Sequence, residues 1–189
     1  EENRRKGLGA FYTPREIVHY MCQESLINYL DTALNGAPAS APAKMEIQGG
    51  LFGAEPTQLS LPPGGKKGAV PREDIETFVR LGEQISHYES VKAAYDFKMP
   101  KNIEKNAKTL DDALKSIAVC DPAVGSGAFP VGMLTEIVRA RSSLTPYFNE
   151  VGERTPYYFK RHAIQNCLYG ADIDPGAVEI AKLRLWLSL

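Results

Sequence analysis

The sequence predicts an α/β fold in which parallel strands alternate with helices. A short apolar run at residues 117–120 leads directly into a glycine turn and then into an amphipathic segment at 129–141. Strand, glycine turn and helix in this order open a nucleotide-type βαβ unit. A second apolar run at residues 167–173 is followed by another helical segment, so we expect the two strands to pair in parallel across the helix between them.

A helix is expected to precede this unit, over residues 14–34. Residues 13–16 offer a hydroxyl for capping at Thr13, a proline in the first turn and a glutamate three residues after the cap. Asn35 and Gly36 supply the stop signal. Apolar residues at helical spacing predict its buried face: Ile17, Met21, Leu26, Ile27, Leu30 and Leu34.

The next part of the chain changes in composition and then becomes helical again. Residues 37–71 are rich in Pro, Gly, Ala and Ser, which cannot bury enough apolar surface to order firmly, so we expect an inserted and partly flexible loop. A second helix is expected over 72–96 and a short one over 110–116. The predicted buried face of the helix over 72–96 comprises Ile75, Phe78, Val79, Ile85 and Tyr88. We therefore divide the chain into residues 1–36, 37–71, 72–116 and 117–189.

Composition limits the class of protein without naming a partner. The 22 basic and 23 acidic residues leave a net charge of -1, so no global field indicates nucleic acid, although DNA is not excluded. The three cysteines, Cys22, Cys120 and Cys167, have no CxxC spacing, which predicts buried free thiols in a reducing cytoplasm and no metal site. No apolar run reaches the roughly 18 residues of a membrane span, so we expect no membrane contact.

The glycine turn carries the main chemical signal. Gly125 and Gly127 lie where the backbone must turn off a strand and let a ligand approach closely. Asp121 closes the strand just before the turn, and a carboxylate there would repel a pyrophosphate but attract the ammonium group of S-adenosylmethionine. The alternative for Asp121 is a simple role as a turn former.

Asp172 follows the second strand, 172 − 121 = 51 positions after Asp121. A carboxylate at this strand end can accept hydrogen bonds from both hydroxyls of a ribose, and Ile173 beside it can lie against an adenine face. Asp174, ahead of Pro175, is expected instead to cap the last helix, which runs from Gly176 past Leu187.

Three segments in this order resemble a known family: residues 9–14 (GAFYTP), 121–129 (DPAVGSGAF) and 169–175 (YGADIDP). They are similar to the first three motifs of N6-adenine DNA methyltransferases, and most similar to the methyltransferase region of type IIS/IIG restriction-modification enzymes. The resemblance implies part of a class I methyltransferase fold, with a Rossmann-like parallel sheet and a helical N-terminal segment. It does not explain residues 37–71 or the helix after them.

The resemblance also implies residue roles. The Tyr-Thr-Pro segment would close over the methionine carboxylate of S-adenosylmethionine, the first glycine turn would hold the methionine part, and Asp172 would hold the ribose. The residues that it places at the cofactor are Tyr12, Thr13, Asp121, Pro122, Ala123, Gly125, Gly127, Asp172 and Ile173.

One part of the family pattern is missing. The Asn/Asp-Pro-Pro-Tyr/Phe motif, which receives the flipped adenine in this family, occurs nowhere in the sequence. We therefore expect the catalytic motif beyond Leu189, DNA contacts mostly in other parts of a longer parent enzyme, and no methyl transfer by this chain alone.

Three other interpretations stay open on the sequence alone. An RNA or protein-glutamine methyltransferase would share the glycine turn, and a non-catalytic module that binds S-adenosylmethionine would share the fold. An NAD-binding domain is the least favoured, because Pro130 stands where the dinucleotide fingerprint has its third glycine.

Overall fold

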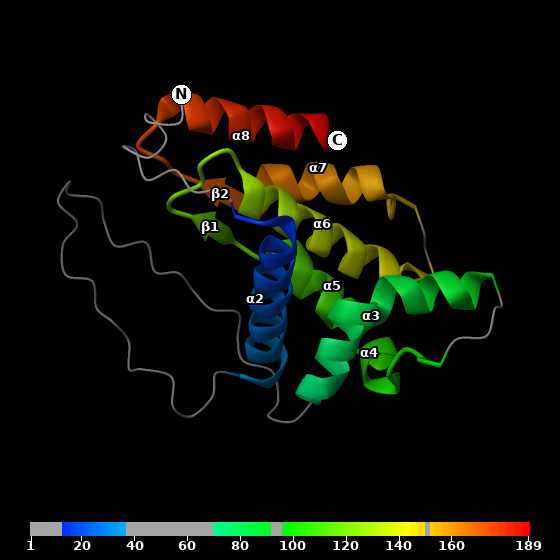
Figure 1. Cartoon of the computed structure of the whole chain (residues 1–189). Helices are drawn as coiled ribbons and strands as arrows, with labels where there is room; N and C mark the ends of the chain where they lie inside the picture. Colours follow the sequence, from blue (N-terminus) through cyan, green and yellow to red (C-terminus); the bar gives the residue numbers. More distant parts are fainter. Residues whose placement is uncertain (1–12, 37–69, 92–95, 150–151) are drawn as a thin grey trace.

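The computed structural model describes residues 13–36, 70–91, 96–149 and 152–189. Helices dominate these residues, and two strands lie side by side near one end of the molecule (Figure 1). The elements in chain order are α2 (Arg15–Asn35), α3 (Arg72–Ser90), α4 (Lys101–Lys105), α5 (Ala107–Ser116), β1 (Val119–Asp121), α6 (Ala128–Ser143), the 3-10 helix η1 (Thr145–Tyr147), α7 (Pro156–Asn166), β2 (Leu168–Gly170) and α8 (Pro175–Leu187).

The two strands pair in parallel, as the sequence predicts, with Cys120 opposite Tyr169. This small sheet among helices is compatible with part of an α/β fold. An apolar run such as residues 117–120 is typical of a buried parallel strand, but Cys120 and its partner Tyr169 are exposed. Side chains alternate between the faces of a strand, so the helices cover the face of Val119 and leave the face of Cys120 open.

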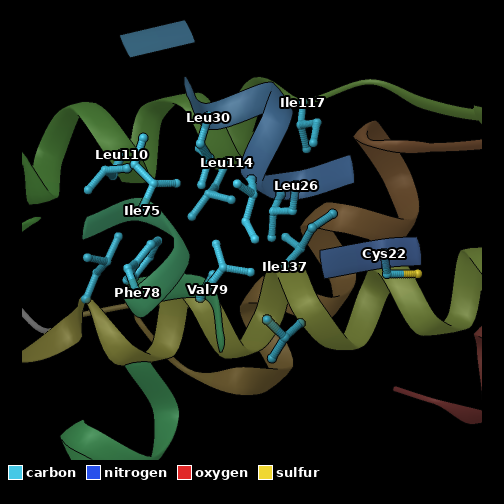
Figure 2. Packing of buried hydrophobic residues seen from close by; sticks show 14 of the residues in the cluster. Cys22, Leu26, Leu30, Ile75, Phe78, Val79, Leu110, Leu114, Ile117 and Ile137 are labelled. Atoms are coloured by element: carbon cyan, nitrogen blue, oxygen red, sulfur yellow. The ribbon is translucent and has the colours of Figure 1, made fainter. Parts of the chain in front are cut away.

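The core lies among α2, α3, α5 and α6 rather than on the sheet. Figure 2 shows Leu26 and Leu30 of α2, Phe78 of α3 and Ile137 of α6 converging on one cluster. Tight packing of apolar side chains from several helices excludes water from this region and is the main source of its stability. The five predicted core positions of α3 include one error, since Tyr88 is 36% exposed.

Two predictions about α2 are wrong. Ile17 and Met21 are exposed, and Val18 and Cys22 are buried in their place, so the buried face is rotated by one residue in the first half of the helix. The helix takes Pro14 as its N-cap, without a side-chain hydrogen bond, so Thr13 does not cap it. The carbonyl of Pro14 accepts the first helical hydrogen bonds from the amides of Ile17 and Val18, each at 3.1 Å.

The cysteine prediction holds for two of three residues. Cys22 and Cys167 are buried free thiols, whereas Cys120 is exposed. Burial, together with the nearby charge of Glu136, raises the pKa of Cys22 to about 12, so this thiol stays protonated at neutral pH.

The remaining differences concern short elements and segment ends. The sequence suggested no helix at α4 or η1, because pieces of one turn bury too few residues to produce a periodic pattern. Helix α3 ends at Ser90, earlier than predicted. The inserted loop lies outside the described residues except for Val70 and Pro71. None of the described helices is long and apolar enough to cross a membrane.

The predicted cap of the last helix is confirmed, since Asp174 accepts a hydrogen bond from the amide of Gly176 at 2.9 Å. We expect Asp174→Ala to lower the free energy of unfolding by about 1 kcal/mol, because an amide of the first turn loses its acceptor. Urea denaturation measures the change. Glu179→Gln, which alters an exposed acid in the same helix, serves as the control, and equal effects of the two variants would contradict the capping role.

Candidate functional site

The carboxyl ends of β1 and β2 are joined by backbone hydrogen bonds. The amide of Ala171 donates to the carbonyl of Asp121 at 2.9 Å, and the amide of Val124 donates to the carbonyl of Ala171 at 2.9 Å. Gly170 allows this approach, because a Cβ there would lie 2.8 Å from Val124 Cγ2. The structure thus brings the two predicted strand ends together at one edge, which is where open parallel sheets bind ligands.

The turn after β1 needs its two glycines for different reasons. Both have positive φ angles, 49° at Gly125 and 83° at Gly127, which L side chains rarely adopt. A Cβ on Gly127 would lie 2.9 Å from Ala181 Cβ, so this glycine also lets α8 pack against the turn. A Cβ on Gly125 would meet no atom of the described residues within 4 Å. Gly125 therefore presents bare backbone to an open space that a ligand can enter.

Asp172, which follows β2, forms a hydrogen bond with this turn. Its Oδ2 accepts a hydrogen bond from the amide of Gly125 at 2.8 Å, and its Oδ1 accepts one from the amide of Asp174 at 2.9 Å. Hydrogen bonds from the backbone of Asp174, Gly125 and Ile173 hold the pKa of Asp172 below its ordinary value. The carboxylate therefore stays ionised at neutral pH, and each oxygen keeps a further lone pair for a ligand hydroxyl.

The other predicted residues lie around the same edge. Asp121 is half-buried and its Oδ1 accepts a hydrogen bond from the amide of Ala123 at 3.1 Å, so its role as a turn former is observed. Pro122 and Ala123 are exposed. Ile173 is 95% exposed, although it is a large apolar side chain. Such exposure carries a cost in water and leaves this side chain available to pack against a flat apolar ligand.

Thr13 lies in a cleft apart from the edge where β1 and β2 end. A cleft of about 620 Å³ lies beside the contact of α2 and α6, and it is lined by Thr13, Ala128, Glu136, Arg139 and Arg184 among others. Neither Asp121 nor Asp172 lines this cleft, so the predicted residues do not share one cavity among the described residues. Ala128 follows Gly127 directly, which places the cleft next to the glycine turn. Tyr12 lies outside the described residues.

Two further residues, Arg184 at the turn and Glu136 in the cleft, escaped the sequence-based prediction. Arg184 of α8 donates to the carbonyl of Ser126 at 2.9 Å and lies 3.4 Å from its hydroxyl. Glu136 of α6 is a buried acid that contacts α2. Arg184 is 58 positions from Ser126 in the chain, and Glu136 is 113 positions from Gln23, so no local pattern could have linked them. Within the described residues, no three His, Cys, Asp or Glu side chains gather closely enough to hold a metal ion.

Comparison with known proteins finds a much longer relative, one segment of which aligns with the whole of this chain. Over 188 residues the chain is 33% identical to a protein of Methanocaldococcus jannaschii named "Putative type II restriction enzyme and methyltransferase RM.MjaORFECS2P". The alignment covers 100% of this chain and 12% of that protein, so the chain spans about an eighth of its length. No protein-family profile matches the chain, and no solved structure matches it. The chain is therefore homologous to one part of a protein whose name combines restriction and methylation.

Proposed function

We propose that this chain is the S-adenosylmethionine-binding part of a DNA adenine (N6) methyltransferase from a restriction-modification system. The observation that carries the proposal is the edge where β1 and β2 end, with an acid on each strand end and a positive-φ glycine turn between them. The homologue named as a restriction enzyme and methyltransferase supports the class of activity.

The residues at this edge suit the three chemical parts of the cofactor. Asp121 offers a carboxylate to the ammonium group, and the bare backbone at Gly125 lets the methionine part approach. Asp172 is ionised and has lone pairs for two ribose hydroxyls. Ile173, with its exposed side chain, offers an apolar surface to the adenine ring. Thr13, which lines the cleft next to the glycine turn, would bind the methionine carboxylate.

The proposed reaction belongs to the longer enzyme. When bound, the cofactor would supply an electrophilic methyl group for the amino group of a flipped adenine base. The role of this chain is to bind and orient the cofactor, which lowers the entropic part of the barrier. DNA is the proposed substrate because the homologue is named as a restriction enzyme, and adenine is proposed from the resemblance of the three sequence motifs.

Calorimetry with S-adenosylmethionine and with NAD tests the cofactor. We expect heat of binding with S-adenosylmethionine and none with NAD. Binding of NAD alone, or of neither compound, would contradict the proposal.

Asp172→Asn is expected to weaken the binding of S-adenosylmethionine. Both carboxylate oxygens accept backbone N–H groups, so the amide NH₂ of asparagine would face a donor at one of them. The variant also removes the negative charge that faces the ribose hydroxyls, and both changes are expected to raise the Kd for S-adenosylmethionine. Asp174→Asn is the matched control, because asparagine caps a helix as well as aspartate does. An equal Kd for both variants would contradict the role of Asp172.

A further inference from the structure

Helix α6 carries a buried acid that the proposed cofactor site does not use. Glu136 is 2% exposed, and its Oε1 lies 2.9 Å from Nδ1 of His19. Its Oε2 accepts a hydrogen bond from Nε2 of Gln23 at 3.2 Å, and Arg139 approaches Oε1 at 3.5 Å. His19 and Gln23 are four residues apart on α2, so both project from the same face of that helix toward one carboxylate.

The two helices touch one turn earlier on α6. A Cβ on Gly132 would lie 2.7 Å from Val18 Cγ1 and 3.1 Å from Cys22 Sγ, so α2 packs directly against the backbone of α6 at this point. Gly132 and Glu136 are themselves four residues apart and share a face of α6. A close steric contact and a polar contact therefore act side by side, and together they define one position of α2 along α6.

On both helices this contact lies in the N-terminal half, a few residues after Thr13 on α2 and after the glycine turn on α6. Helix α6 begins at Ala128, directly after Gly127, and α2 begins two residues after Thr13. Thr13, His19, Ala128 and Glu136 all line the 620 Å³ cleft beside the contact of the two helices. Any sliding or rotation of α2 on α6 would therefore change the distance from Thr13 to the turn.

A buried carboxylate is a poor choice for stability alone. An apolar residue of similar volume often stabilises a protein equally well or better, because it avoids the cost of desolvating a charge. A buried polar contact instead selects one arrangement of two helices over neighbouring ones, as polar residues do in helical bundles.

We infer that Glu136 is a positioning residue, which fixes α2 on α6 so that Thr13 faces the space beside the glycine turn. The inference rests on the proposed function, because it assigns Thr13 to the methionine end of the cofactor. Through Glu136, the buried contact of α2 and α6 sets the shape of the cofactor site without touching the cofactor.

Glu136→Gln tests this inference, with Glu83→Gln as the matched control. Glu83 is an exposed acid of α3 that also pairs with Arg139, at 2.9 Å. Hydrogen exchange without cofactor is expected to speed up at residues 15–21 in Glu136→Gln and to stay unchanged in α7, whereas Glu83→Gln matches the wild type. The Kd for S-adenosylmethionine is expected to rise about tenfold. Residues that orient a metal ligand without touching the metal cause a loss of this order when they are removed, and Glu136 would orient Thr13 in the same indirect way.

His19→Ala covers the case in which Glu136→Gln fails to fold, because the side chain of His19 is 46% exposed. It is expected to give the same local change in exchange at smaller amplitude. Unchanged exchange at residues 15–21, or an equal increase in α7, would overturn the inference. If the wild-type chain does not bind S-adenosylmethionine, the proposed function fails, while the exchange data still decide whether Glu136 holds α2 on α6.

Discussion

Replacing Asp111 by asparagine is expected to lower the free energy of unfolding by about 3–5 kcal/mol, because the buried Arg141 and the partly buried Arg154 lose their shared counter-charge. Asp111 of α5 accepts hydrogen bonds from Arg141 at 3.0 and 3.3 Å and from Arg154 at 3.0 and 3.1 Å. Arg141 also lies over the ring of Phe159, 4.4 Å from its centroid. The acid thus joins α5, α6 and the segment before α7 at one buried point.

This network leaves no spare acceptor. Nη1 of Arg141 is buried without a hydrogen-bond partner among the described residues. The two arginines share one carboxylate, so the cluster holds two positive charges and one negative charge even in the wild type. Removal of the negative charge leaves both guanidinium groups in a region of low dielectric, where an unpaired charge is most costly.

The effect should depend on pH in a defined direction. Burial acts to raise the pKa of Asp111, but hydrogen bonds and charges from Arg154 and Arg141 outweigh it and hold the pKa below its ordinary value of 3.8. Its contribution to stability is therefore complete above the pKa of the unfolded chain and is lost as the pH falls through the folded pKa. The difference between wild type and Asp111→Asn should shrink below about pH 4.

Urea denaturation at pH 7 and at low pH measures both effects. Asp112→Asn is the control, since Asp112 is the adjacent residue of α5 and is exposed. A loss at pH 7 no greater than that of Asp112→Asn would show that the arginine cluster does not depend on Asp111.

Gly127→Ala is expected to lower the free energy of unfolding by roughly 2–5 kcal/mol, as the sum of two costs. The first is backbone strain, because φ is 83° at this position. The second is a clash, because the new Cβ would lie 3.0 Å from Cα of Ala181, a backbone atom that moves only with α8. We expect α8 to shift and the binding of S-adenosylmethionine to weaken with it.

Two other glycines separate these costs. Gly125→Ala introduces a residue at φ 49° whose Cβ has no atom within 4 Å in the described part of the chain, so it tests strain alone. Gly152→Ala meets neither a positive φ nor a neighbour, so its effect should be close to zero. The expected order of destabilisation is Gly127→Ala, then Gly125→Ala, then Gly152→Ala, measured by thermal unfolding. A smaller effect at Gly127 than at Gly125 would contradict the packing argument.

The long elements were predictable because their signals are local. Helices α2, α6 and α8 follow from apolar spacing and from proline and glycine at their ends, and the two strands follow from short apolar runs before turns. The rotation of the α2 core face was not predictable, because Gly132 of α6 decides which side of α2 is closest. Exposure of Cys120 could not be foreseen either, since an apolar run does not reveal whether both faces of its strand are covered.

For the candidate site, the sequence by itself determined the residue types: an acid before a turn with two glycines, and a second acid after the next strand. These follow from neighbours in the chain, whose spacing controls turns and caps. Only the tertiary structure decided that Asp172 supports Gly125, that Arg184 holds Ser126, and that Glu136 joins α2 to α6. Each of these contacts spans at least 47 positions, and such a contact exists only once packing of the whole chain has brought its partners together.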